Sequence, residues 1–577
     1  MLGIAQRLFA ALALGCAWSI LASSPSVAQQ TDLSDLIKRL DRLEQNNLQL
    51  EAQNDQLKKQ IDDLKTPAPI TLPAAAPPVQ PVAGYPSIFT TVQPGAASMP
   101  TEKKNDPERS AAESPPFQVG QPLKMEATWR NAMWFESPDK AVRWTVGGVV
   151  QYDMTYFKAP SAAYINSIGT FNNRVDTGYS LQDSNSFRRA RLRFAGNLWE
   201  QVEFAAQYEF AQALDLRRRT LGISPTPTST PFNDYDPAED VGFNEVYIGL
   251  NQLPLLGTIR IGRHRESLNF VTATPNTNQI WLERGLLFDA FNGDFNFSNG
   301  ITVQNTYWND RIYTCLGFFH ANNNTNRGFF SVGGGEYAYD GRLTALPVYD
   351  EDRQLWVHVG ADYSYRMPHQ DRLRYRARPM IRSGTSFQTP NILTTGAIFT
   401  NDAQQIANLE FAMAYGRFTF AAEGTRSWVT NAFSGAAPGT AGAVSRGTYA
   451  AQGGYVEALC FLTADHRKYV KERPGYARVT PASTFYFMDT EKIRLFSRGA
   501  WEIGARYDYV NLSNNGIDGG ESNAYTACVN WYLNANLRVQ ANYSWMDRHF
   551  DAPSTVGTDG RVEGGFHSFG LRFNLDF

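Results

Sequence analysis

The last ten residues of the chain, SFGLRFNLDF, alternate strictly between polar and apolar side chains. A β-strand places successive side chains on opposite faces, so this alternation predicts a strand with one polar and one apolar face. In water, such a strand at a sheet edge would expose both its apolar face and its unpaired backbone groups. The pattern is better explained if the apolar face contacts lipid and the polar face lines a water-filled lumen. The apolar face would carry Phe569, Leu571, Phe573, Leu575 and Phe577.

Composition favours the same class of protein. Aromatic residues make up 13% of the chain, yet after its N-terminal segment no apolar run approaches the ~20 residues that a membrane-spanning helix needs. A transmembrane β-barrel has this composition because only alternate residues of each strand face lipid. The formal net charge of −3 excludes a generally basic nucleic-acid-binding protein, so no nucleic acid is expected as a partner.

The N-terminus has the pattern of a secretory signal peptide. Arg7 is followed by an apolar run over residues 8–21 and then by Pro-Ser-Val-Ala before Gln29. A charged start, an apolar middle and small residues before the cleavage point are typical of export signals. We expect residues 1–28 to be removed and the mature protein to be exported.

Residues 29–65 are predicted to form a coiled-coil helix, because leucine recurs every seven residues along them. Asn47 and Asn54 fall at a positions, where buried asparagine sets the register and tends to specify dimers. A single amphipathic surface helix is the alternative, but asparagines that set the register between helices have no role in a helix without a partner. The heptads imply an oligomer whose helix number the sequence leaves open. Residues 66–124 are rich in Pro and Ala and are expected to form an extended linker.

Residues 125–577 carry the alternating segments and are predicted to form the barrel domain. Sixteen segments can be counted, and single-chain bacterial barrels have an even number of strands. Their connections alternate in length, as expected for short periplasmic turns and long external loops. One connection, 464–498, is long and basic; either a strand pair lies within it or it folds back toward the pore. The predicted strands are 142–156, 187–197, 202–210, 243–250, 258–264, 300–308, 311–319, 354–366, 372–379, 405–415, 417–428, 450–463, 499–510, 522–533, 537–545 and 566–577.

The predicted fold is therefore all-β: a 16-stranded antiparallel transmembrane β-barrel preceded by a short N-terminal coiled-coil helix. Its last strand would close the barrel. Phe573 and Phe577, on the apolar face of that strand, are predicted to form the signal that the outer-membrane assembly machinery reads.

Arginines recur at alternate positions in two predicted strands, 187–197 and 372–379. Period two places the guanidinia of each strand on one face, about 7 Å apart along it. Neighbouring like charges destabilise one another, and on the lipid face each would cost about 2–4 kcal/mol at mid-bilayer. A water-filled lumen suits them better, because arginine stays charged, its fork fits phosphate oxygens, and arginine rings select anions. The predicted anion ladder comprises Arg189, Arg191, Arg193, Arg372, Arg374, Arg376 and Arg378.

The same alternation places carboxylates in the lumen, among them Glu209, Asp362 and Asp508. These acids allow a second interpretation, in which lumen arginines form ion pairs across strands and stiffen the wall of an unselective pore. The four arginines of 372–379, with no acid between them, favour selective anion conduction. Further arginines that alternation places in the lumen are Arg143, Arg260, Arg366, Arg506, Arg538 and Arg572.

Several stretches resemble the phosphate-selective porin O and P family: NSFRRARLRFAG (185–196), IRIGRHRESLNF (259–270), WLERGLLFDAF (281–291), GAWEIGARYDYVNL (499–512) and CVNWYLNANLRVQANYSW (528–545). The resemblance covers nearly all of the predicted barrel. It implies a trimeric, sixteen-stranded outer-membrane porin with an arginine ladder, to which the three arginines of strand 187–197 would belong. It further implies that 265–299 is a constricting loop and that 464–498 is a periplasmic segment folded inward.

The sequence thus predicts an outer-membrane porin through which small anions, phosphate first among them, diffuse passively. We expect a homotrimer surrounded by outer-membrane lipid, with its coiled coil in the periplasm. No enzyme is expected, because the chain has no GxSxG, HExxH or CxxC motif, and no catalytic residue, cofactor or metal is predicted. The alternatives are a general unselective porin and a structural protein that tethers the envelope, using its coiled coil to contact the cell wall.

Overall fold

The computed structural model describes residues 123–577 with the exception of 159–180, 182, 212–241, 294–296, 322–335, 369–370, 383–390, 490–491, 496–497 and 552–562. The predicted signal peptide, the predicted coiled coil and nearly all of the predicted linker lie outside the described residues.

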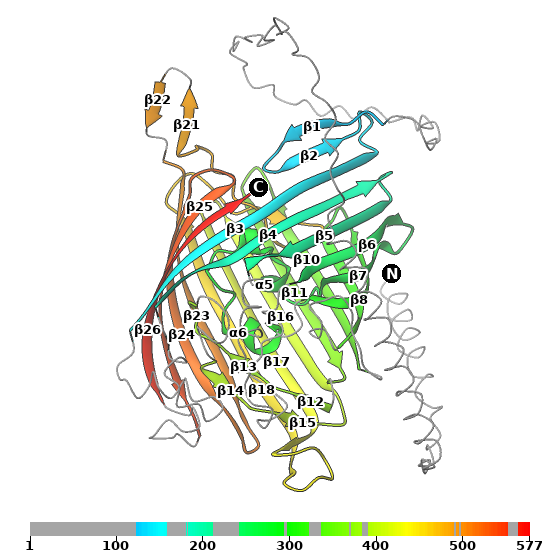
Figure 1. Cartoon of the computed structure of the whole chain (residues 1–577), viewed down its shortest axis with the longest axis vertical. Helices are drawn as coiled ribbons and strands as arrows, with labels where there is room; N and C mark the ends of the chain where they lie inside the picture. The colour runs from blue at the N-terminus through cyan, green and yellow to red at the C-terminus, as the bar shows by residue number, and fades with distance from the viewer. Residues whose placement is uncertain are drawn as a thin grey trace, which may run out of the picture. The chain divides into compact units, whose positions relative to one another are not determined.

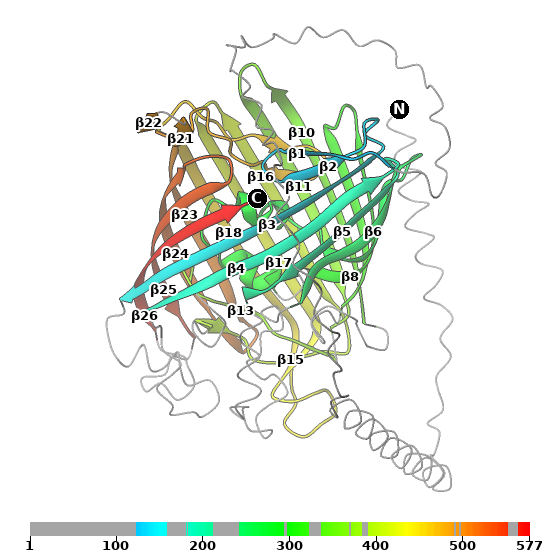
Figure 2. The same ribbon diagram turned by 45° about the horizontal axis from the view of Figure 1, so that its top comes forward.

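Sixteen antiparallel strands in the described part of the chain close into a barrel (Figures 1 and 2). Each strand pairs with the next, and β26 pairs with β3, where Leu571 lies opposite Met154. The predicted all-β sixteen-stranded barrel is confirmed. The strands are β3 (Val142–Lys158), β4 (Ser184–Leu198), β5 (Val202–Glu209), β6 (Phe243–Leu253), β7 (Gly257–Arg265), β8 (Phe297–Tyr307), β9 (Ile312–His320), β10 (Tyr337–Asp350), β11 (Leu355–Arg366), β16 (Gln404–Tyr415), β17 (Phe418–Ser434), β18 (Val444–Phe461), β23 (Ala500–Asn514), β24 (Ile517–Tyr532), β25 (Leu537–His549) and β26 (Gly564–Asp576).

The two faces of the wall have the polarity that the terminal alternation predicts. On β26, Phe569 and Phe573 are exposed on the outside, whereas Arg572 and Asn574 are buried on the inside. Apolar side chains outside and polar side chains inside reverse the order of a water-soluble protein and fit a barrel in lipid. No helix in the described residues is long and apolar enough to cross a membrane, a finding that does not bear on crossing by strands.

The C-terminus lies in the seam where the barrel closes. The Phe577 N–H donates to the Gly148 carbonyl at 3.0 Å, and the Gly148 N–H donates to the Phe577 carbonyl at 2.6 Å. A Cβ on Gly147 would lie only 2.6 Å from the Phe577 oxygen, so this approach requires glycine. Beyond this point the edge of β3 pairs with β2 (Met133–Glu136), the second strand of a hairpin with β1 (Glu126–Trp129).

One predicted strand, 372–379, is wrong. β11 pairs directly with β16 along its whole length, from Leu355 opposite Tyr415 to Arg366 opposite Gln404, which leaves no place for a strand between them. The segment instead contributes β12 (Arg372–Leu373) and β13 (Arg376–Ala377), which pair with β15 (Ile398–Phe399) and β14 (Leu393–Thr394).

β10 is a barrel strand that the sequence did not predict. It takes the place of the wrongly predicted strand 372–379, so the barrel still has sixteen strands. Its alternation is weak in the sequence because Ala338 and Leu346 lie on the buried inner face. Pro347 lies at a register shift between Ala345 and Val348, where a bulge tolerates a residue without a backbone N–H.

Connections from both ends of the barrel return into its interior. From the end opposite Phe577, residues 266–296 carry α5 (Phe270–Ala273), η3 (Asn276–Asn278) and α6 (Leu286–Phe291), and Figure 1 shows both α-helices inside the barrel. Residues 367–403 enter from the same end. They contact the inner face of β17, because Tyr375 Oη lies 2.7 Å from Ser427 Oγ. From the Phe577 end, residues 462–499 contribute β19 (Tyr469–Val470) and β20 (Gly475–Tyr476).

The connection 464–498 contains both features that its sequence left open. Its first part folds into the barrel, because the Tyr476 hydroxyl donates to Glu457 Oε1 at 2.9 Å and the Trp356 indole donates to the Arg467 carbonyl at 2.8 Å. Its second part forms a separate strand pair, β21 (Tyr486–Asp489) with β22 (Lys492–Leu495), which projects from the barrel end in Figure 1.

Candidate pore lining

The loop 266–296 is fixed to the inner face of β17 through a buried carboxylate. Glu423 accepts hydrogen bonds from the backbone N–H groups of Phe270 and Val271, each at 2.9 Å. Asn269, at φ 51°, caps the same turn through its side chain, which accepts from the Thr272 N–H at 2.8 Å. These bonds satisfy the free N–H groups of Phe270, Val271 and Thr272 at the start of α5.

Glu283 is a second anchor of this loop, and it joins three arginines. Arg188 donates to it at 2.7 and 3.1 Å, Arg572 at 3.3 Å, and Arg382 lies 3.3 Å away. Burial alone would raise the pKa of Glu283, but the guanidinium of Arg188, followed by those of Arg382 and Arg189, holds it well below its usual range. The loop is therefore tied by charge to β4, to β26 and to the neighbouring inner segment 367–403.

The inner segments cover one side of the lumen and leave the other accessible to water. On the covered wall, the inward faces of β16–β18 and β23–β26, the pairs Arg467–Glu502, Arg506–Asp508 and Arg572–Asp153 have side chains only 0–1% exposed. On the open wall, the inward faces of β4–β7, the side chain of Arg193 is 35% exposed and that of Arg260 is 23% exposed. Water therefore reaches Arg193 and Arg260 on this wall, whereas Arg189, Glu209 and His264 on the same strands are buried.

The three predicted ladder arginines of β4 face this lumen. Arg191 pairs with Glu209, Arg193 lies 3.5 Å from Glu245, and Arg189 donates to the Gln151 side chain at 2.6 Å. A bulge shifts the register of β4 against β3 between Gln151 and Tyr152. Because of this bulge, adjacent Arg188 also points inward, although strict alternation would place it outside.

The other predicted ladder, Arg372, Arg374, Arg376 and Arg378, does not follow a barrel strand. Tyr375 and Ala377, which alternation would place against lipid, are fully buried inside. The Arg378 N–H donates to Asp289 at 3.2 Å, so this segment packs against the loop 266–296. An extended segment shows period two whether or not it belongs to the barrel, which explains the error.

The predicted secondary lumen arginines are mostly paired. Arg366 donates to Glu266 at 2.6 and 2.8 Å, Arg506 donates to Asp508 at 2.7 Å, and Arg260 pairs with Glu203. Arg538 is buried and donates to the Asn276 carbonyl at 3.5 Å, and Arg143 is exposed at the start of β3. Ion pairing, which the second interpretation of the sequence expected across strands, therefore describes most of these side chains, although Arg506 and Asp508 lie on the same strand.

Sequence reasoning missed three arginines at the edge of the open lumen, because inward folding decides their place. Arg284 donates to the carbonyls of Val271 and Thr274 at 3.1 and 3.2 Å, and Arg265 donates to the carbonyls of Thr272 and Thr274. Burial and neighbouring Arg265 lower the pKa of Arg284 well below its usual value, as expected where like charges crowd. Arg473, from the segment that enters at the Phe577 end, is exposed and lines a cavity of about 30 Å³ with Arg260, Arg265 and Glu245.

A model of the family described as "Phosphate-selective porin O and P" matches residues 163–577. The chain belongs to this family. An uncharacterized protein of Caulobacter vibrioides is 26% identical over 527 residues, which cover 89% of this chain and 86% of that protein. Solved porins also match this chain, at low identity and low TM-score. The anion-selective porin from Comamonas acidovorans is 10% identical, with a TM-score of 0.40, covering 75% of this chain and 99% of its own. Salmonella typhi OmpF is 12% identical, with a TM-score of 0.41, and the match covers 78% of this chain and 100% of the OmpF chain.

As a porin O and P family member with a closed sixteen-stranded barrel, the protein is an outer-membrane porin. Family and fold indicate a channel rather than an enzyme. Among the described residues of this porin, Arg193 and Arg260 on β4–β7 and Arg473 on the inner segment 462–499 are charged side chains that water reaches.

Proposed function

We propose that this porin lets small anions, phosphate among them, diffuse passively along its open wall. The observation that carries the proposal is the excess of guanidinia over carboxylates there. Glu203, Glu209, Glu245 and Glu283 are the nearby acids; Arg260 already holds Glu203, and Arg188 and Arg382 hold Glu283. The guanidinia that gather along this side are Arg188, Arg189, Arg191, Arg193, Arg265, Arg284 and Arg473.

The way these arginines are held supports a role in conduction. Arg265 and Arg284 are oriented by hydrogen bonds to backbone carbonyls, which fix the guanidinium without a direct carboxylate hydrogen bond among the described residues. The Arg193–Glu245 pair is long, at 3.5 Å, and partly exposed, so a passing anion can compete with Glu245 for the guanidinium. A row of fixed cations in a narrow lumen concentrates anions and repels cations.

A planar bilayer under a KCl gradient tests the proposal. The unaltered protein should show a reversal potential of anion-selective sign, and phosphate should reduce its chloride current. Arg193→Gln combined with Arg473→Gln should move the reversal potential toward zero and weaken the phosphate block. Arg143→Gln, an exposed arginine at the start of β3, is the matched control. A reversal potential near zero in the unaltered protein would show that the arginines are structural and the pore is general.

We further propose a homotrimer whose Phe577 end faces the periplasm. The short connections 199–201, 254–256, 308–311 and 416–417 support this orientation, because they lie at the same end as Phe577. Phe573 and Phe577 would then be presented to the assembly machinery from the periplasm. The predicted coiled coil would also be periplasmic and within reach of the cell wall.

A further inference from the structure

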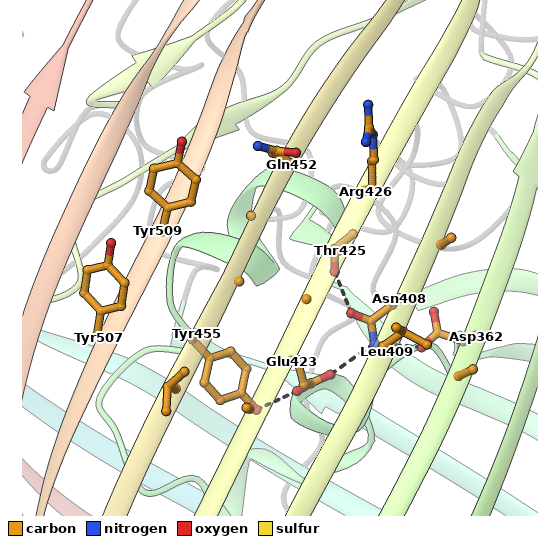
Figure 3. Close-up of a pocket in the computed structure, with 17 residues that line it drawn as sticks. Asp362, Asn408, Leu409, Glu423, Thr425, Arg426, Gln452, Tyr455, Tyr507 and Tyr509 are labelled. Carbon is orange, nitrogen blue, oxygen red and sulfur yellow. Dashed lines mark hydrogen bonds between the residues drawn. The ribbon is translucent and has the colours of Figure 1, made fainter.

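A hollow in the outer, membrane-facing surface of the wall lies across β16, β17, β18 and β23 (Figure 3). Its volume is about 790 Å³. Gly424 and Gly454 are directly opposite each other on adjacent strands, so two side chains are missing at its centre. Leu409 and Tyr509 flank this glycine pair in the same cross-strand row.

The back of the hollow is closed by polar side chains that point into the lumen. Thr425 donates to Asn408 at 2.6 Å, and the Tyr455 hydroxyl donates to Glu423 at 2.6 Å, as Figure 3 shows. Glu423 is also the residue that anchors the loop 266–296. Hydrogen-bonded side chains of the inner face therefore lie behind the hollow.

The positively charged side chain of Arg426 lies at one end of the hollow. Arg426 is exposed on the outer surface opposite Gln452, and its guanidinium lies 5.6 Å from the centre of the Trp428 ring. Within the part of the chain that the structure describes, no carboxylate forms an ion pair with Arg426. A charged side chain on the lipid-facing surface calls for an anion, since lipid tails offer none.

The position of Arg426 matches the headgroup level of a membrane. Phe418, Phe420, Ala422 and Gly424 precede it on the outer face of β17, and eight residues of tilted strand rise by about 20 Å. The apolar band of such barrels is about 25 Å tall. Gln452, Asn511 and Glu521 continue a polar row across the neighbouring strands at the level of Arg426.

We propose that this hollow binds an anionic, phosphate-bearing membrane lipid from the leaflet at the end opposite Phe577. The phosphate accepts from Arg426 and Gln452, and one acyl chain lies over Gly424 and Gly454. Two features favour a lipid over a protein partner: the cation is at headgroup level, and the apolar hollow lies directly on its mid-membrane side. The aromatic bodies of Tyr507 and Tyr509 form the side of the groove, while their hydroxyls bond to Asn523 and Glu521.

Native mass spectrometry of the full-length protein tests the proposal. The protein is delipidated in neutral detergent and equilibrated with equal amounts of phosphatidylglycerol and phosphatidylcholine. The unaltered protein should retain phosphatidylglycerol preferentially, and Arg426→Gln should lower the ratio of retained phosphatidylglycerol to phosphatidylcholine on the order of tenfold. Gly424→Leu should reduce retention of both lipids by filling the hollow, which it can do because a Cβ there meets no atom within 4 Å.

Arg417→Gln is the matched control, because Arg417 is exposed in the turn at the opposite end of β17. It should leave lipid retention unchanged, and heat-modified gel mobility should report a folded barrel for every variant. Equal lipid retention in the unaltered protein, Arg426→Gln and Gly424→Leu would overturn the proposal. Loss of oligomer mass in Gly424→Leu with unchanged lipid retention would also overturn it, by identifying the hollow as a contact between chains.

Discussion

The covered and the open walls of this barrel use the same residue types for different purposes. Both present arginines to the lumen, and both place carboxylates within reach of them. On the covered wall, the inner segments exclude water from pairs such as Arg572–Asp153, whose side chains are 0–1% exposed. On the open wall, Arg193 keeps 35% of its side chain exposed beside Glu245. What covers an ion pair, rather than its sequence, decides whether it holds the wall together or faces a solute.

The physical consequence is a difference in what each pair contributes. Removing one partner of a buried pair leaves an uncompensated charge and typically costs about 3–5 kcal/mol. An exposed pair contributes only about 0–1 kcal/mol to stability. The covered wall should therefore govern stability, and the open wall should govern ion selectivity.

The largest expected effect is on the covered wall. Arg572→Met leaves the buried Asp153 carboxylate without its arginine and removes one arginine from Glu283. We therefore expect a loss of about 3–5 kcal/mol in the free energy of unfolding. Guanidinium unfolding in detergent micelles measures it. The double variant Arg572→Met with Asp153→Asn should lose less, because no bare charge remains at Asp153. An unchanged unfolding midpoint in Arg572→Met would contradict the distinction between the walls.

Glu283 should make stability depend on acid pH. Its pKa is lower in the folded protein than in the unfolded chain, so its contribution is complete above the unfolded value of about 4.3 and is lost as pH falls toward the folded value. Unfolding experiments between neutral and acid pH should show a smaller acid-dependent loss in Glu283→Gln than in the unaltered protein. Parallel pH curves for the two proteins would show that Glu283 does not tie the loop to its three arginines.

On the open wall, Arg193→Gln should do the opposite of Arg572→Met. Its partner Glu245 is within reach of water, so the free energy of unfolding should change by less than about 1 kcal/mol. The reversal potential should nevertheless move toward zero, because one fixed cation is lost from the conducting side. A stability loss as large as that of Arg572→Met would place Arg193 with the structural pairs.

The smallest effect on selectivity is expected from Arg372→Gln combined with Arg374→Gln. Strict alternation gives these residues the same role as Arg193, but they lie in the inner segment 367–403 and not on a barrel strand. The reversal potential of this double variant should shift less than that of the Arg193→Gln variant, although two charges are removed. A larger shift would mean that this segment, and not β4, lines the selective part of the pore.

The barrel could be predicted from sequence because strand alternation is a local property. The faces of β26 follow from ten residues, and each long alternating run reports its own orientation to lipid. Two local exceptions limited the prediction. A bulge turns Arg188 inward beside Arg189, and two apolar residues on the inner face of β10, Ala338 and Leu346, weaken the alternation of that strand. The segment 372–379 shows that extended backbone alone does not identify a barrel strand.

The pore lining could be predicted only in part, because it depends on contacts between distant segments. Arg189, Arg191 and Arg193 were predictable from β4 itself. Arg284 and Arg473 were not, since their place depends on loops entering from opposite ends and meeting where Asn278 donates to the Tyr476 carbonyl at 2.9 Å. Nothing in the local pattern distinguishes Arg506, which is covered, from Arg193, which is open.

Substituted-cysteine modification during bilayer recording tests the central claim most directly. In a background with Cys315, Cys460 and Cys528 replaced by Ser, Arg193→Cys places a thiol on the open wall and Gln540→Cys places one on the covered wall. An anionic methanethiosulfonate reagent should lower the current through Arg193→Cys and leave that through Gln540→Cys unchanged. Rapid modification of Gln540→Cys with no effect on Arg193→Cys would show that the conducting path runs along the other side of the barrel.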